Sequence, residues 1–273
     1  MTGARRPQPA AAAALVAAAI ALALAACSGT LPPLRGQIEV GGEGYAIVVA
    51  GDDAGGGDLY AVRASGGPVV PITFSTVGEM RPALSPDGRR VAFLRGRAVA
   101  DSTPGSVWVM DLLTGGEREV ERPRKAGTPR RVGWSRDGAA LTVATDAGLY
   151  RARPAAGSLG AEPVPAAERA AAESTLAVLL GDPIFARVVP CSDPGALCVA
   201  SDTGSPGLLA DHARDATRWG PDSVAFLTGS VIEVRPLGRG VARRIEWSGL
   251  PGRARELTGF AGREVKGDRA NGR

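Results

Sequence analysis

The sequence predicts an all-β fold: a β-propeller of about five four-stranded antiparallel blades, with an incomplete ring of six as the alternative. A turn followed by an apolar strand recurs, as Ser-Pro-Asp-Gly and Val-Ala-Phe-Leu in residues 84–94 and as Ser-Arg-Asp-Gly and Leu-Thr-Val-Ala in residues 134–144. Residues 219–227 keep the Pro-Asp turn and the strand, and residues 191–200 are a looser copy. Such repeated units are typical of modular all-β arrays.

Each unit contains short segments that are rich in β-branched and aromatic residues and are separated by turns. We expect strands at residues 45–50, 58–63 and 69–74, at 81–84, 90–94, 106–111 and 118–121, and at 131–134, 140–144 and 148–152. The fourth unit covers roughly 185–210, and the fifth covers 217–247 with a middle strand at 231–236. Residues 166–173 have a helix-forming composition, so we expect a short helix or loop between units three and four.

The beginning of the chain has the features of a secretory signal peptide. It contains no acid, carries Arg5 and Arg6 near the start, and is apolar from residue 10 to residue 26, which is short for a membrane span. The run ends in Leu-Ala-Ala followed by Cys27. This ending resembles the bacterial lipobox, in which the cysteine is joined to diacylglycerol and becomes the new N-terminus. An ordinary signal peptide with a chance cysteine is the alternative.

Four segments follow from these features. We expect residues 1–26 to be a lipoprotein signal peptide, 27–44 the acylated cysteine and a flexible Gly- and Pro-rich tether, 45–250 the propeller, and 251–273 a disordered basic tail. The lipid bilayer would hold the mature protein through acylated Cys27. The predicted localisation is therefore the periplasmic face of an outer membrane or the outer face of a cell membrane. Without the signal peptide, the net charge of +4 falls to about +2, which gives no case for binding nucleic acid.

Cysteine usage also fits an exported protein. With Cys27 assigned to lipid, Cys191 and Cys198 are left as a candidate disulfide. A turn centred on Pro194 and Gly195 would place the two cysteines directly opposite each other on adjacent strands. Two reduced core thiols are the alternative.

The repeated phrases resemble those of TolB-like propellers, also called WD40-like or PD40 repeats. The residues that carry the resemblance are the turn residues Ser85, Pro86, Asp87 and Gly88, Ser135, Asp137 and Gly138, and Pro221 and Asp222. The resemblance implies that each turn joins the two inner strands of a blade, and that a blade ring commonly has six members. A lipobox ahead of such repeats is also similar to the propeller half of LpqB-like lipoproteins, which place a globular domain between anchor and propeller.

The turn residues have structural reasons of their own. Proline fixes φ for the first central position of a turn, aspartate can accept hydrogen bonds from backbone groups ahead of it, and glycine adopts the left-handed conformation. The bulky residue before each turn, Leu84, Trp134 or Trp219, is expected to pack between neighbouring sheets.

Residues for catalysis or cofactor binding are not evident in the sequence. The sole histidine, His212, has no Gly-x-Ser-x-Gly serine to serve, and we predict no catalytic residue, cofactor or metal site. Asp52, Asp53 and Asp58 lie in a Gly-rich loop that lacks the pattern of a calcium loop, so a solvated hairpin loop is the simpler interpretation. The basic residues of 122–125 and 130–131 lack interleaved aromatics and are read as an exposed loop, with an acidic partner or anionic lipid as the alternative.

With catalysis unsupported, the sequence favours a lipid-anchored, non-catalytic propeller of the cell envelope that acts as a protein-binding scaffold for an envelope partner. Loops of such a fold gather at one face, which suits recognition. The alternative is a module that binds or processes envelope polysaccharide through the propeller channel. Aromatic residues make up only 4% of the chain, which disfavours a carbohydrate platform.

Overall fold

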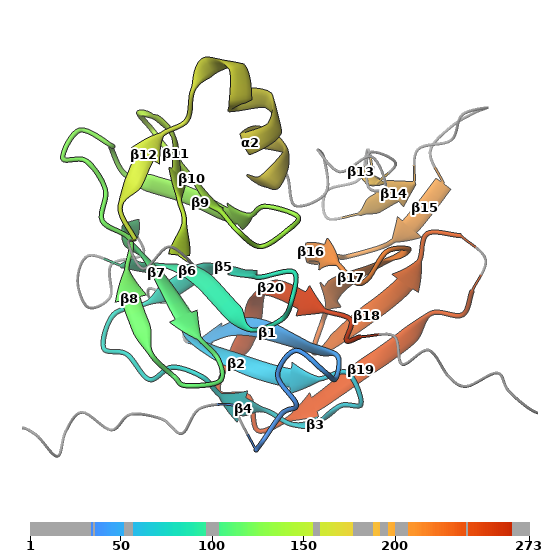
Figure 1. The fold of residues 1–273 in the computed structure, drawn as a ribbon. Helices are drawn as coiled ribbons and strands as arrows, with labels where there is room; N and C mark the ends of the chain where they lie inside the picture. The colour runs from blue at the N-terminus through green and yellow to red at the C-terminus, as the bar shows by residue number, and fades with distance from the viewer. Residues whose placement is uncertain are drawn as a thin grey trace, which may run out of the picture. The chain divides into compact units, whose positions relative to one another are not determined.

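The computed structural model describes residues 34, 36–51, 57–96, 104–154, 159–176, 188–191, 196–199, 207–238 and 240–263. These residues form five mainly antiparallel sheets, which we number I to V in chain order (Figure 1). The all-β, propeller-type architecture predicted from the repeats is therefore confirmed. Among the described segments, no helix has the length and apolar character needed to cross a membrane.

The sheets follow the predicted units. Sheet I has the order β20 (Arg253–Phe260), β1 (Tyr45–Gly51), β2 (Asp58–Arg63) and β4 (Val70–Pro71). Sheet II contains β5 (Glu79–Leu84), β6 (Arg90–Gly96), β7 (Pro104–Asp111) and β8 (Glu117–Glu119). Sheet III contains β9 (Pro129–Trp134), β10 (Leu141–Thr145), β11 (Gly148–Ala152) and β12 (Ala161–Pro163).

The last two sheets differ from this pattern. Sheet IV contains three described strands, β13 (Val188–Pro190), β14 (Leu197–Val199) and β15 (Gly207–Ala210). Sheet V contains β16 (Arg214–Arg218), β17 (Ser223–Thr228), β18 (Val231–Pro236) and β19 (Arg243–Ser248). A short strand from the first unit, β3 (Gly67–Pro68), pairs in parallel with β19. The strand predicted at 69–74 is therefore shortened to β4, because Gly67 and Pro68 just before it pair with β19 of sheet V.

Apolar side chains of alternate strand positions fill the spaces between neighbouring sheets. One cluster joins sheets I and II around Ile47 and Phe93, and a second joins sheets II and III around Leu94 and Val143. A third joins sheets V and I, and a fourth joins sheets IV and V. Residues on both faces of a strand are therefore buried, which explains why β1, β6 and β17 read as continuous apolar runs.

Sheet III is covered on its other face by a helix. The segment η2 (Ala166–Glu168) continues into α2 (Arg169–Leu176), as expected from its composition. Ala172 and Leu176 are buried, and Gly133 of β9 lies so close to the carbonyl of Thr175 that a Cβ atom would overlap it. Arg151 of β11 also pairs with Glu168 at 2.6 Å. The helix is therefore fixed on sheet III by packing and by charge.

Two predicted boundaries are wrong. The flexible tether was expected to extend to residue 44, but Leu34, Ile38 and Val40 are buried in the core between sheets I and II. The disordered tail was expected from residue 251, but residues 253–260 form β20, which pairs along the whole of β1. Both segments have few apolar residues, and each is ordered by contacts with residues distant in the sequence. Residues 1–33 and 264–273 lie outside the described residues.

Candidate functional site

The first strand of a sheet, such as β5, β9, β16 or β20, has two ends that we name separately. For β5, β9 and β16, the turn end is where the strand leads into the hairpin turn at 85–88, 135–138 or 219–223. For β20, it is the end at Phe260, whose ring lies close to Gly88 of the first of these turns. The bulge end is the opposite end, where these strands begin. All four strands run in the same direction. Arg81 and Leu84 of β5 meet Glu256 and Thr258 of β20 in that order, and Asp215 and Thr217 of β16 meet Leu257 and Gly259. Trp134 of β9 and Gly138 after it lie beside Ala83 and Pro86 in the same order.

The turn end contains the residues of the repeated phrase. Ser85 Oγ accepts a hydrogen bond from the backbone N–H of Arg90 at 2.9 Å and donates to Asp87 Oδ1 at 2.6 Å. Gly88 has a φ of 64°, which favours glycine at that turn position. Ser85 and Asp87 therefore stabilise their own hairpin, between the first and second strands of sheet II, while the Gly88 carbonyl also accepts a hydrogen bond from the Tyr45 hydroxyl of sheet I.

Sheet III repeats this arrangement with its own residues. Ser135 Oγ accepts from the N–H of Ala140 at 2.9 Å and donates to Asp137 Oδ1 at 2.6 Å. The hydroxyl of Ser135 and the N–H of Ala139 both stabilise the carboxylate, and they lower the pKa of Asp137 below its usual value. The two hairpins are thus built alike from the same residue types.

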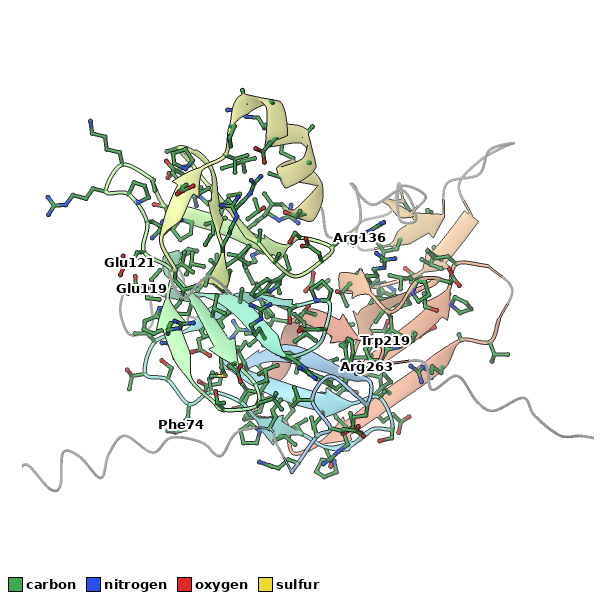
Figure 2. All side chains as sticks on the ribbon, viewed as in Figure 1. Phe74, Glu119, Glu121, Arg136, Trp219 and Arg263 are labelled. Atoms are coloured by element: carbon green, nitrogen blue, oxygen red, sulfur yellow. A yellow bond between two sulfur atoms is a disulfide. The ribbon has the colours of Figure 1, made fainter. Side chains whose placement is uncertain are left out.

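The third hairpin departs from the prediction. Arg218 opposes Val224, just as Leu84 opposes Val91, so Trp219 lies one residue further on, inside a shorter turn. Its side chain packs between sheets V and I, whereas Trp134 packs between sheets II and III. The position of Trp219 before the turn is therefore corrected, while its burial between sheets is as expected (Figure 2).

The indole groups of the two tryptophans also differ. Trp134 Nε1 donates to the carbonyl of Ala83 in sheet II at 2.9 Å, and the guanidinium of Arg90 lies 4.7 Å from its ring. Trp219 Nε1 is buried and has no hydrogen-bond partner among the described residues. The indole N–H of Trp134 therefore links sheets II and III by a hydrogen bond, whereas among the described residues the indole N–H of Trp219 makes no such link.

The two cysteines of sheet IV are joined by a disulfide with a Cα–Cα distance of 5.3 Å. The predicted pairing of the strands is nevertheless wrong by two residues. Cys198 opposes Val189, and the N–H of Cys191 donates to the carbonyl of Ala196. The disulfide therefore connects a diagonal pair rather than directly opposed residues. Residues 192–195, with the predicted turn, lie outside the described residues.

The bulge end has a feature that the sequence did not indicate. In four sheets the first strand has extra residues relative to its neighbour, and these are Arg81 with Pro82 in β5, Arg130 in β9, Asp215 in β16 and Arg255 in β20. Bulges turn side chains away from the regular pleat and are common beside functional sites. Four neighbouring sheets thus present charged residues at the same end.

Two of these bulge residues, Arg81 and Asp215, lie beside Glu256 where β5, β20 and β16 are side by side. The Arg81 guanidinium is 3.6 Å from Glu256 Oε1, and the Arg81 backbone N–H donates to Glu256 Oε2. The Asp215 carboxylate accepts from the backbone N–H of Leu257, the next residue of β20, at 2.5 Å. We name Arg81, Asp215 and Glu256 the bulge cluster.

The backbone of the bulge cluster is strained. Arg81 and Asp215 have φ values of 54° and 41°, a region that residues with a Cβ atom rarely adopt. Asp215 is exposed to solvent, yet protein atoms lie around its carboxylate. Desolvation and the nearby charge of Glu256 raise the pKa of Asp215, while the Leu257 amide and Arg81 oppose this rise. Strain and a perturbed carboxylate at one place favour a functional site.

A second carboxylate lies at the start of β5, deeper in the protein. Glu79 is fully buried and accepts hydrogen bonds from Thr73 Oγ1 and from Arg95 Nη2, the latter at 2.6 Å. Arg95 also binds Glu117 at 2.8 Å, and its guanidinium lies 4.4 Å from the ring centre of Trp108. Burial raises the pKa of Glu79 to about 7, despite the opposing effect of Thr73 and Arg95.

The other residues considered from the sequence are dispersed. Cys27, Asp52 and Asp53 lie outside the described residues. His212 is exposed beside Asp211. Arg124 and Lys125 are exposed, while Arg130 pairs with Asp146 at 3.7 Å. Within the described ranges, no three side chains of the metal-binding types gather into a site.

Comparisons with known proteins give a partial match. No family model matches the chain. A curated protein, "Protein TolB homolog" from Chlorobium luteolum, is 29% identical over 133 residues, which cover 48% of this chain and 28% of that protein. The match therefore spans much less than two thirds of the relative's length.

Solved structures give low similarity scores. TolB from Acinetobacter baumannii has a TM-score of 0.48 at 13% identity, with 90% of this chain and 71% of that chain covered. A chain of the nidogen/laminin complex has a TM-score of 0.47 at 9% identity and coverages of 79% and 98%. The putative TolB from Agrobacterium tumefaciens has a TM-score of 0.36 at 15% identity and coverages of 74% and 60%. Taken with its repeated turns and its sheets, the chain is similar to TolB-like β-propellers.

Proposed function

We propose that this chain is a lipid-anchored protein of the cell envelope that binds another envelope protein at the bulge end and has no catalytic activity. The observation that carries the proposal is the bulge cluster. Arg81 and Asp215 occupy strained positions on either side of Glu256, and their charges serve no hairpin of their own sheets. Such residues cost stability, and recognition of a partner is a function that would retain them.

The charge pattern of the cluster suits a protein partner. It combines one guanidinium with two carboxylates, so a partner with ion-pairing groups of both signs would complement it. A polyanion would be repelled by Asp215 and Glu256, and the exposed basic residues Arg124 and Lys125 lie on a different loop. We therefore favour a folded protein or an extended peptide as the partner.

Capture of a partner from the native envelope tests this function. Full-length protein is cross-linked in cells and purified, and the recovered proteins are compared between wild type, Arg81→Glu and Arg136→Glu. Arg136 is exposed at the turn end and serves as the matched control (Figure 2). We expect one protein to be recovered with wild type and Arg136→Glu and to be lost with Arg81→Glu. Equal recovery with both variants would count against the bulge end as the binding surface.

The lipid anchor is tested separately. Mass spectrometry of the mature protein should show a diacylglyceryl group on Cys27, and Cys27→Ser should release the protein from the membrane fraction. An unmodified N-terminus produced by cleavage elsewhere would remove the anchor from the proposal, and binding at the bulge end would then be judged on its own.

Processing of envelope polysaccharide is the second candidate. One observation favours it: Glu256 is close enough to Asp215 to raise its pKa, and glycoside hydrolysis uses a pair of carboxyl groups with different pKa values. Incubation of the protein with purified envelope polysaccharide, followed by analysis of released fragments, tests this activity. Fragments formed by wild type and absent with Asp215→Asn would establish it over the scaffold function.

A further inference from the structure

Phe74 is the exposed large aromatic residue of the described structure. Its relative exposure is 87%, and the other large apolar residues that stand out to a similar degree are Leu208 and Val241. Phe74 lies in the loop between β4 and β5, which leads to the bulge end of sheet II (Figure 2). Single exposed apolar side chains are common on protein surfaces, but Phe74 differs in that hydrogen bonds order the loop on both sides of it.

The loop that carries Phe74 is held on both sides of the ring. The preceding residue, Thr73, is buried, and its Oγ1 accepts a hydrogen bond from the N–H of Leu59 at 2.8 Å. The N–H of the following residue, Ser75, donates to Asp58 Oδ1 at 2.8 Å. Both contacts attach the loop to β2, so the ring is displayed from an ordered backbone.

The buried Glu79 supports this loop from below. Thr73 Oγ1 donates to Glu79, whose carboxylate is fixed by Arg95, and Arg95 is in turn held by Glu117. A charged group at a fully buried position is expensive, and here it positions the residue next to Phe74. The loop is thus preorganised, which lowers the entropy cost of binding through Phe74.

We propose that Phe74 is the apolar anchor of the envelope-protein interface, inserting into an apolar pocket of the partner. This inference rests on the proposed function, and it names the residue that supplies most of the contact energy. Interfaces depend on a few such anchors, which are enriched in aromatic residues. Asp58, Thr73 and Glu79 are positioning residues for the anchor.

The surroundings of Phe74 favour a protein over a lipid surface. Its exposed neighbours are Pro71 at the end of β4 and Thr76 in the loop. The charged group that contacts the loop next to Phe74 is the carboxylate of Asp58. Binding to an anionic bilayer is favoured by basic residues beside several apolar side chains. One aromatic ring beside an acid is better matched by a pocket in a protein.

Photo-crosslinking from Thr76, which is exposed and two residues from Phe74, tests the proposal. A photoreactive amino acid is placed at position 76 of the full-length protein in cells, and the discrete protein adduct is quantified. We expect Phe74→Ser to lower the adduct yield by at least about tenfold. Val241→Ser removes an equally exposed apolar side chain from another loop, and it should leave the yield unchanged. Melting temperatures measured in parallel should be equal for the three proteins.

A second variant separates anchoring from positioning. Asp58→Asn keeps Phe74 but weakens the contact with the Ser75 amide, and we expect it to lower the adduct yield less than Phe74→Ser does. An adduct that survives Phe74→Ser would overturn the anchor while leaving the proposed function intact. Failure to form any adduct at position 76 would overturn it as well, and capture that still depends on Arg81 would then keep the proposed function. Labelling confined to lipid would overturn the protein partner in favour of membrane contact.

Discussion

The turn end and the bulge end of the sheets are built on different rules. At the turn end, sheets II and III repeat one set of hydrogen bonds, with Ser85 and Asp87 in one and Ser135 and Asp137 in the other. At the bulge end, the sheets present different residues at equivalent places, such as Arg81 in sheet II and Asp215 in sheet V. Of the two ends, only the turn end therefore repeats the same residue types.

This difference separates residues that build a sheet from residues that are available for binding. A hairpin turn has the same needs in every sheet, so the same serine, aspartate and glycine recur. The bulge end carries strain at Arg81 and a buried charge at Glu79, and neither is needed for closing a hairpin. In a repeat protein, the positions where the repeat fails are thus the better candidates for function.

The largest effect on stability is expected from removing Arg95, the cation that pairs with the buried Glu79 at the bulge end. Arg95→Ala leaves Glu79 buried without its charged partner, and we expect the free energy of unfolding to fall by about 3 kcal/mol at pH 8. The loss should be smaller at pH 5, because Glu79 is then protonated and needs no cation. Urea unfolding at both pH values measures it, and an equal loss at both would show that the ion pair is not responsible.

Lowering the pH should raise the stability that Glu79 contributes at the bulge end and lower the stability that Asp137 contributes at the turn end. The pKa of Glu79 is raised to about 7, so the folded protein binds this proton more tightly than the unfolded chain does. Stability from this group is present below the unfolded pKa and is lost as the pH rises through about 7, a difference of about 3 kcal/mol at most. The pKa of Asp137 is lowered, so its contribution is lost only as the pH falls through that lowered value.

Glu79→Gln isolates the effect of the buried carboxyl. The wild type should gain stability relative to this variant as the pH falls from 8 to 5, as measured by thermal melts over that range. Parallel pH profiles for the two proteins would show that Glu79 does not titrate there.

The turn end should give a moderate effect on stability and none on binding. Ser85→Ala removes a buried hydroxyl that serves the Arg90 amide and Asp87, and we expect a loss of about 1–2 kcal/mol. Ser135→Ala should cost less, because Ser135 is only half-buried. Thermal melts measure both losses. Reduced partner capture by a Ser85→Ala protein that is still folded would contradict the division between the two ends.

The smallest effect on stability is expected at the bulge cluster, where the loss of binding should nevertheless be large. Arg81→Gly removes the salt bridge with Glu256 but relieves the strain of a positive φ, so the free energy of unfolding should change by less than about 1 kcal/mol. Partner capture should be lost. A variant that binds as well as the wild type would show that the charge at Arg81 is not used in recognition.

Local sequence signals predicted most strands and the repeated turns, because a turn and the adjoining apolar run depend on neighbouring residues. They did not predict β20, whose buried residues include Ala254 and Thr258 and whose other side chains are largely charged. That strand is ordered by backbone pairing with β1, at the other end of the chain. The many charged residues of this segment therefore led to the prediction of a disordered tail.

The bulge cluster was inaccessible to sequence reasoning for a related reason. A bulge inserts residues without a characteristic motif, and Arg81 meets Glu256 across 175 residues of chain. The position of Trp219 was misjudged because its hairpin is shorter than those of sheets II and III. The length of a turn is decided by the strand pairing that follows it, so a matching phrase does not guarantee a matching position.

The pairing of β20 with β1 has a consequence for the order of events during synthesis. In sheet I, β1 is complete once the first 51 residues have been made, but its neighbour β20 is complete only when residues 253–260 have been made. A ribosome-bound chain therefore cannot complete this sheet, and its apolar strand β1 has one unpaired edge until residues 253–260 have emerged. A late strand of this kind would suit a protein that crosses a membrane before it folds, because it delays completion of the sheet.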